Sequence, residues 1–159
     1  MYNHGVAFKV IADCEIGEGN RALQTIQKIM PENSQNSYEH SGMEPYAISN
    51  MYLGPECTSR RGEAPLSWIT GAAGWLFRGI VENIIGVYAD YNGLRVKPTL
   101  PDEWHCVQLS RHYRNCIYDF TIENNGQGEY SLLVDGNKID GNQIPVFADQ
   151  RIHKVLVRR

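Results

Sequence analysis

The stretch SWITGAAGWLF, residues 67–77, decides the fold of the first half of this chain. Thr70 and Gly71 stand directly before apolar residues spaced at helical intervals over residues 72–85, a pattern that predicts a mostly buried helix with Thr70 as its N-cap. Such a helix start presents backbone N–H groups and a partial positive charge, both of which favour an anion such as phosphate. The simpler interpretation is a capped core helix without a ligand, and these residues alone favour it.

Two further helices are expected nearer the N-terminus. Residues 6–14 are apolar on most faces, and residues 20–30 form an amphipathic stretch that Asn20 could cap. Together they predict a helical hairpin with more apolar surface than it can bury alone. His4 lies just ahead of the first helix. A histidine at such a place is usually a structural polar residue, and the alternative interpretation is an anion or substrate ligand.

The second half of the chain changes to the period of β-structure. Asn92-Gly93 between two apolar runs predicts a hairpin turn with positive φ. Strand-like runs separated by turn residues follow at residues 107–113, 116–123, 130–134 and 154–157. We therefore expect an antiparallel β domain, most simply a sandwich.

Composition and charge exclude several classes of protein. The 159 residues are 42% hydrophobic and 21% charged, which is typical of a globular chain, and the net charge of -3 offers no basic surface for nucleic acid. No apolar run is long enough for a bilayer, and the N-terminus does not look like a signal peptide. The four cysteines lack CxxC spacing, which favours reduced thiols in a cytoplasmic protein over a disulfide framework or a zinc site (Cys14, Cys57, Cys106 and Cys116).

Several short blocks, taken in order, resemble the C-terminal part of glycoside hydrolase family 94, the inverting cellobiose, cellodextrin and related disaccharide phosphorylases. Each block alone is weak, but their order and spacing are specific and cover essentially the whole chain. The blocks are Tyr2-Asn3-His4, Ala12-Asp13-Cys14, residues 17–22, Glu44-Pro45-Tyr46, Ser67-Trp68-Ile69-Thr70-Gly71, residues 85–95, Pro101 and Trp104.

The resemblance implies a fold and a division into domains. Residues 1–86 are expected to be the last helices of an (α/α)6 barrel, the family's catalytic domain, and residues 87–159 its C-terminal β domain. The fold class is thus mixed α and β, with a helical part followed by an antiparallel β-sandwich-like domain.

The resemblance also implies a reaction. In this family, inorganic phosphate attacks the anomeric carbon of a β-glucoside while an aspartic acid protonates the leaving oxygen, and inversion gives α-glucose 1-phosphate. His4, Thr70 and Gly71 match the family's phosphate-binding residues. Phosphate is a substrate, so the resemblance implies no cofactor and no metal.

The match departs from the family pattern, and the family's phosphate-binding arginine and most of its sugar-binding residues lie upstream of this chain. The general-acid aspartate lies upstream of this chain, and Asp13, Glu44 and Asp90 are outside its motif. Ala72 replaces the threonine often found after Thr-Gly. The isolated chain is therefore expected to be inactive and to need an upstream half of the same enzyme, with a homodimer as in the family. The alternative is a non-catalytic, carbohydrate-associated β module from a truncated gene.

Overall fold

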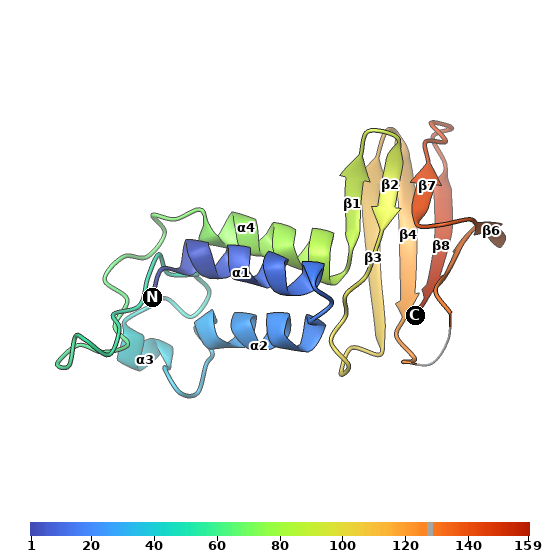
Figure 1. Cartoon of the computed structure of the whole chain (residues 1–159). Coiled ribbons are helices and arrows are strands. Elements are labelled where there is room, and N and C mark those ends of the chain that lie inside the picture. The colour runs from blue at the N-terminus through green and yellow to red at the C-terminus, as the bar shows by residue number, and fades with distance from the viewer. Residues whose placement is uncertain (127–128) are drawn as a thin grey trace. The chain divides into compact units, whose positions relative to one another are not determined.

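The computed structural model describes residues 1–126 and 129–159, which form two compact units, Met1–Ile80 and Val81–Arg159 (Figure 1). The first unit is helical and the second is built from strands, so the expected mixture of α and β is confirmed. The division into residues 1–86 and 87–159 concerns the family's domain plan and stays a prediction.

The helical unit is centred on three packed helices. Helix α1 (Asn3–Glu15) contacts both α2 (Gly19–Ile29) and α4 (Ala72–Arg78), and the short helix α3 (Tyr38–Ser41) lies between α2 and α4 in the sequence. Small and branched side chains such as Ala7, Val10 and Ala22 are fully buried between them. The first two helices occur close to where the apolar pattern predicts them, although Glu18 rather than Asn20 is the N-cap residue of α2.

An ion pair fixes α1 against α2. The Asp13 carboxylate, buried in α1, accepts hydrogen bonds from Lys9 in the same helix and from Arg21 in α2. Lys9 also donates to the Thr25 hydroxyl at 2.8 Å. Burial raises the pKa of Asp13, but the hydrogen bonds from Lys9 and Arg21 outweigh it, so the pKa lies below its ordinary value. Asp13 is thus an ionised structural carboxylate.

The helix that follows Gly71 is not α-helical throughout. Helix α4 ends at Arg78 and continues as a π-helical segment, η1 (Gly79–Ile84), where the sequence predicts one helix over residues 72–85. The change begins at Gly79, where an added Cβ would lie 3.4 Å from Cγ1 of Ile11. Because glycine has no side chain, α1 can approach closely at this point. The π-helical segment itself is a rare departure from regular α-helix.

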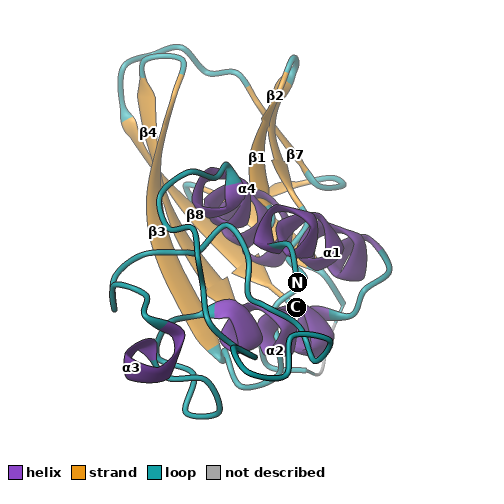
Figure 2. Ribbon diagram, turned by 90° about the vertical axis from the view of Figure 1, so that its left-hand side faces the viewer, coloured by secondary structure: helices purple, strands orange, loops and turns teal. Residues whose placement is uncertain are grey.

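The β unit contains two sheets, which Figure 2 shows as separate layers. The three-stranded sheet has the order β1-β2-β7 and the five-stranded sheet β3-β4-β8-β5-β6. The strands are β1 (Val87–Asp90), β2 (Gly93–Val96), β3 (Cys106–Tyr113), β4 (Cys116–Glu123), β5 (Ser131–Val134), β6 (Asn137–Ile139), β7 (Gln143–Pro145) and β8 (Ile152–Arg158). The sequence gives no clear signal for β6 and β7, which are only three residues each.

One pairing corrects the expectation of a purely antiparallel domain. Strand β8 lies between β4 and β5 and pairs with β4 in parallel, with Phe120 opposite Val155. The other strand pairs are antiparallel. Alternate residues of β4, among them Tyr118 and Ile122, are buried, so one face of the five-stranded sheet forms core.

The hairpin at Asn92-Gly93 forms, but not through the turn that was expected. Asp90 pairs with Gly93, so Tyr91 and Asn92 are the loop residues and Gly93 is the first residue of β2. An added Cβ at Gly93 would lie 1.9 Å from the carbonyl oxygen of Ile144 in β7. Gly93 has the positive φ that was expected, 150°, and a third strand approaches it closely, so both the backbone conformation and the contact require glycine.

Candidate functional site

The residues that the resemblance assigns to phosphate come from two distant parts of the helical unit and lie in contact. His4 is in the first turn of α1, and Thr70 and Gly71 end the loop that precedes α4. A Cβ added to Gly71 would lie 2.9 Å from Cε1 of His4 and 3.4 Å from its Nδ1. The imidazole thus packs directly on the Gly71 backbone, and a larger residue at position 71 would displace it.

Aromatic side chains surround the His4 ring. Its centroid lies 5.1 Å from that of Phe8 and 6.4 Å from that of Trp75, and Phe8 meets Trp75 edge to face. The Tyr2 hydroxyl is 3.3 Å from Nδ1 of His4. When that hydroxyl donates to Nδ1, the ring proton is on Nε2, which is then the atom that can donate to an anion.

The chain ahead of His4 is fixed by buried polar contacts. Asn3 is fully buried, and its amide nitrogen donates to the Ser49 hydroxyl at 2.7 Å and to the Ser49 carbonyl at 3.1 Å. Its backbone N–H donates to the Asn50 carbonyl at 2.8 Å. Asn3 therefore sets the position from which α1, and with it His4, begins.

Thr70 is not the N-cap residue that the sequence predicts. Gly71 has that position, and the Thr70 hydroxyl accepts a hydrogen bond from the Ala72 N–H at 3.0 Å. The first N–H of the helix is thus satisfied by the residue before the N-cap position, at the two-residue spacing that also occurs in ordinary caps. Because the Thr70 oxygen accepts that bond, the hydroxyl proton can be donated to a ligand.

A tight loop positions Thr70. Two short backbone bonds run from Ile69 N–H to the Ser67 carbonyl and from Thr70 N–H to the Trp68 carbonyl, at 2.6 and 2.9 Å, and Trp68 has a φ of 60°. Glu44 supports this conformation from outside the loop, because its Oε1 accepts from the Trp68 indole at 3.0 Å and from the Ser67 hydroxyl at 3.3 Å. A hydrogen bond from its own backbone N–H, followed by that from Trp68, lowers the pKa of Glu44.

The carboxylates considered for a general acid have structural partners. Asp13 is paired with Lys9 and Arg21, and Glu44 accepts from the loop before Thr70. In the β unit, Asp90 is 2.7 Å from the Arg95 guanidinium. These contacts hold the three carboxylates in structural roles and lower the pKa values of Asp13 and Glu44, which agrees with the three residues lying outside the family's general-acid motif.

Sequence reasoning missed the supporting residues Asn3, Ser49 and Glu44. The only available signal was that Tyr2-Asn3-His4 and Glu44-Pro45-Tyr46 are blocks of the resemblance, without a stated role for Asn3 or Glu44. A separate cluster that could hold a metal occurs in the β unit, where Cys116, Asp149 and His153 converge. The sequence favoured reduced thiols at all four cysteines, and each is a free thiol in the structure.

The helices in the described residues include none that is long and apolar enough to cross a membrane.

Comparison with known proteins gives a consistent result. The family model of the glycosyl hydrolase 94 superfamily, catalytic domain, matches residues 1–86. The chain is 42% identical over 159 residues to solabiose phosphorylase of Paenibacillus borealis, covering 98% of this chain and 21% of that protein. It is 32% identical to 3-O-beta-D-glucopyranosyl-beta-D-glucuronide phosphorylase of the same organism and 28% identical to N,N'-diacetylchitobiose phosphorylase of Vibrio proteolyticus. Each of these two alignments covers 99% of this chain; the first covers 21% of the relative and the second covers 20%.

The chain thus spans about a fifth of the length of these relatives. The family model matches more than half of its residues, in the region that contains His4, Thr70 and Gly71. The chain belongs to the glycosyl hydrolase 94 superfamily.

Proposed function

We propose that this chain is the C-terminal part of an inverting disaccharide or oligosaccharide phosphorylase, in which it supplies His4, Thr70 and Gly71 to the phosphate site. The enzyme would cleave a β-glucosidic bond with inorganic phosphate and release α-glucose 1-phosphate. The general-acid aspartate, and most of the groups that bind sugar, would come from the portion of the relatives that this chain does not cover.

The observation that carries this proposal is the contact between His4 and Gly71. The two residues are far apart in sequence, and the resemblance alone, without the geometry, assigns both to one anion. An added Cβ at Gly71 would come within 3.5 Å of Nε2 of His4, so the ring and the backbone can face the same small ligand.

The chemistry of these groups suits a phosphate dianion. The Thr70 hydroxyl, the Gly71 N–H and Nε2 of His4 are all donors, and hydrogen bonds to a charged acceptor are stronger than those between neutral groups. Their task is to hold phosphate in line with the anomeric carbon, which is a contribution of positioning and charge. Phosphate takes the place of the activated water of an inverting hydrolase, so the site needs no general base.

Two buried oxygen atoms favour an incomplete helical unit. Within the described part of the chain, Oδ1 of Asn3 and Oε2 of Glu44 are buried and have no hydrogen-bond partner. Buried polar atoms almost always have one. Both residues support the proposed phosphate site, so donors from the missing portion of the enzyme would complete their contacts. These helices would then be the last ones of an (α/α)6 barrel.

The sugar is not identified by these residues. The relatives named above act on solabiose, on a glucosyl glucuronide and on diacetylchitobiose, as their names state. A β-glucoside of the cellobiose or cellodextrin type remains the substrate that the resemblance favours. The cytoplasmic location and a homodimer likewise remain predictions. Phosphorylases among the relatives favour an enzyme part over a non-catalytic β module.

The test is the phosphate dependence of an enzyme reconstituted with the missing portion. Thr70→Val keeps the shape of the side chain and removes one hydroxyl, whose hydrogen bond to a charged group is worth about 1.5–3 kcal/mol. The KM for phosphate should therefore rise about tenfold or more while the KM for the glucoside stays nearly constant. Thr58→Val, in an exposed loop of the same unit, is the matched control and should change neither constant.

His4→Ala should raise the KM for phosphate in the same way. The double variant with Thr70→Val should deviate from additivity, because both groups would touch one anion. His112→Ala, on an exposed position of β3, is the control for loss of an imidazole. An unchanged phosphate dependence in both single variants would reject the assignment of the site.

A further inference from the structure

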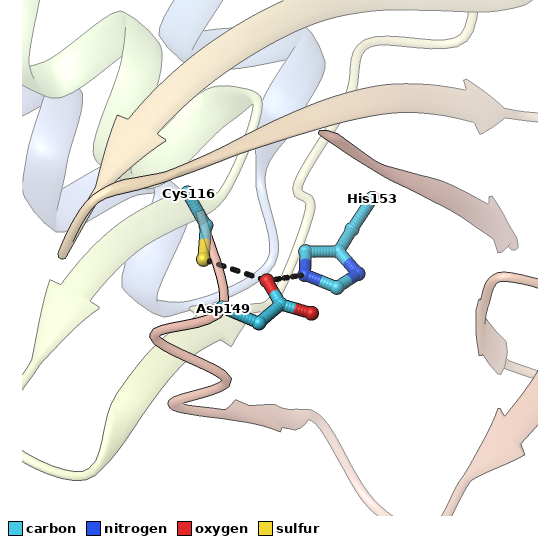
Figure 3. A group of neighbouring side chains, drawn as sticks. All are labelled: Cys116, Asp149 and His153. Carbon is cyan, nitrogen blue, oxygen red and sulfur yellow. Dashed lines mark hydrogen bonds and ion pairs between the residues drawn. The ribbon is translucent and has the colours of Figure 1, made fainter. Parts of the chain in front are cut away.

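A cluster of unlike side chains occurs at one end of the five-stranded sheet, far along the chain from the proposed phosphate residues. Cys116 begins β4, His153 is the second residue of the adjacent β8, and Asp149 lies in the segment that leads into β8. Figure 3 shows the thiol and the imidazole both directed at one carboxylate oxygen of Asp149. The phosphorolysis proposed above uses none of these groups.

The two distances measured from Asp149 are close to those between ligands of a tetrahedral metal site. Asp149 Oδ1 is 3.3 Å from the Cys116 sulfur and 3.0 Å from Nε2 of His153, and all three ligand atoms lie within 4.8 Å of one another. Ligands at about 2.0–2.3 Å from a tetrahedral zinc ion are about 3.3–3.6 Å apart. The two distances from Asp149 therefore need to lengthen by only a few tenths of an ångström, and the Cys116 sulfur and Nε2 of His153, within 4.8 Å of each other, would take up the adjacent ligand positions.

A fourth residue orients the histidine from its other side. Nδ1 of His153 is 2.7 Å from Oδ2 of Asp135, which lies in the turn between β5 and β6. This contact directs Nε2 toward Cys116 and Asp149. Histidines that bind metals usually donate their second ring N–H to a carboxylate or carbonyl in this way. The arrangement is thus that of a ligand with its supporting carboxylate.

The surroundings hold the ligands in place. Cys116 and His153 are buried, and the His153 ring stacks on Phe147 and Tyr118 with centroid distances of 4.5 and 5.3 Å. Asp149 is about one-third exposed. Its neighbours Ala148 and Gln150 both have positive φ, at 52° and 61°, which non-glycine residues adopt at an energetic cost. The backbone bends sharply on both sides of Asp149 to present its carboxylate.

From this geometry we propose that Cys116, Asp149 and His153 bind a borderline-soft divalent cation, with zinc as the best match, and that Asp135 is the positioning residue. Thiolate and imidazole ligands suit zinc and do not suit calcium or magnesium. The Cys116 thiol and Nε2 of His153 each release their proton to solvent when the ion enters. Asp149 supplies the third ligand, and solvent reaches the fourth position along its exposed side. The ion would connect the segment before β8, which carries Asp149, to Cys116 at the start of β4.

Cobalt is a suitable probe because Co²⁺ occupies zinc sites and a thiolate ligand gives it a strong near-ultraviolet charge-transfer band. The 159-residue chain, stripped with a chelator, is titrated with Co²⁺ and then with Zn²⁺. We expect the band to saturate at one equivalent and to disappear on addition of one equivalent of Zn²⁺. Cys116→Ser keeps a donor to Asp149 and should abolish the band, whereas the matched control Cys106→Ser, on an exposed position of β3, should keep it.

Asp135→Asn separates a positioning role from a purely structural one. It should keep the cobalt band but weaken Zn²⁺ binding by about 10–100-fold, the usual effect of losing the carboxylate behind a ligating histidine. Far-ultraviolet circular dichroism checks that each variant is folded. If Cys116→Ser does not fold, Asp149→Asn takes its place, and an affinity loss of at least tenfold is expected. A wild-type chain without the thiolate band, or a band unchanged in Cys116→Ser, would overturn the metal site and leave a hydrogen-bonded cluster.

Discussion

The helical unit and the β unit differ in how many of their large apolar side chains are exposed to solvent. In the helical unit, Phe77 is 67% exposed, Ile69 72% and Phe8 47%. In the β unit, Phe120 and Ile122 of β4 are 2% and 0% exposed, and large exposed apolar side chains such as Ile152, at 58%, are fewer than in the helical unit. Isolated proteins rarely leave several large apolar residues exposed close together. The β unit thus closes a core of its own, whereas the helical unit presents surface suited to a further layer of protein.

The largest effect predicted from this comparison is on catalysis. We expect the 159-residue chain alone to release no glucose 1-phosphate from cellobiose or cellodextrins with phosphate. Protonation of the leaving oxygen contributes a factor of about 10² to 10⁴, and the group proposed to provide it lies outside the chain. The assay is enzymatic detection of glucose 1-phosphate. Turnover in the range of ordinary enzymes would mean that the helical unit is catalytically complete.

The second prediction concerns association. The whole chain should self-associate through its exposed apolar side chains, whereas a piece containing residues 81–159 should remain monomeric, because its core residues are already covered. Size-exclusion chromatography with light scattering on both samples measures the difference. A monodisperse, monomeric whole chain would contradict our interpretation of the helical surface.

The third prediction compares truncations in the two units. Ile122→Ala in β4 removes a fully buried side chain and should lower the free energy of unfolding by about 2–5 kcal/mol. Phe77→Ala removes a larger but exposed side chain and should change it by no more than about 0.5 kcal/mol. Urea denaturation followed by circular dichroism gives both values. Equal losses would show that Phe77 already has a packing partner in the isolated chain.

The smallest effect concerns the ion pair between α1 and α2. The pKa of Asp13 in the folded chain lies below its ordinary value of 3.8, which is the value expected after unfolding. The stabilising contribution is therefore fully present above pH 3.8 and is lost as the pH falls through the folded pKa. Asp13→Asn should lower the melting temperature at neutral pH, and the difference from wild type should shrink in acid. If the difference in melting temperature between wild type and Asp13→Asn did not change with pH, the effect of the substitution would come from packing and not from the ion pair.

The sequence was most informative where the pattern was local. Apolar periodicity located α1 and α2, and alternation located β3 and β4. The resemblance selected His4, Thr70 and Gly71, of which His4 and Gly71 prove to be in contact, although their role as a phosphate site stays a prediction. Residues that act through neighbours close in sequence leave signals that can be recognised without a structure.

The errors arise where a distant segment decides the outcome. Gly93 has the expected positive φ, but it lies in β2 rather than in the turn, and the approach of Ile144 in β7 is a second reason for glycine that the sequence does not reveal. The parallel pairing of β4 with β8 joins segments separated by three short strands, β5, β6 and β7, so no local sequence pattern indicates it. The proposed metal ligands Cys116, Asp149 and His153 have no common motif. Their convergence depends on the strand order, which periodicity does not reveal.

The central position of β8 has a consequence for the order of folding. Strands β3 and β4 form one hairpin, β5 and β6 form another, and β8 is the strand that joins them into one sheet. During synthesis, residues 152–158 leave the ribosome after both hairpins. Strands β4 and β5 therefore cannot pair with β8 until that segment has emerged. Pairing at such separation in sequence is slow compared with hairpin closure. We expect pulsed hydrogen exchange during refolding to protect the β3–β4 hairpin first and Val155 and Val157 last, and simultaneous protection would show that the sheet forms in one step.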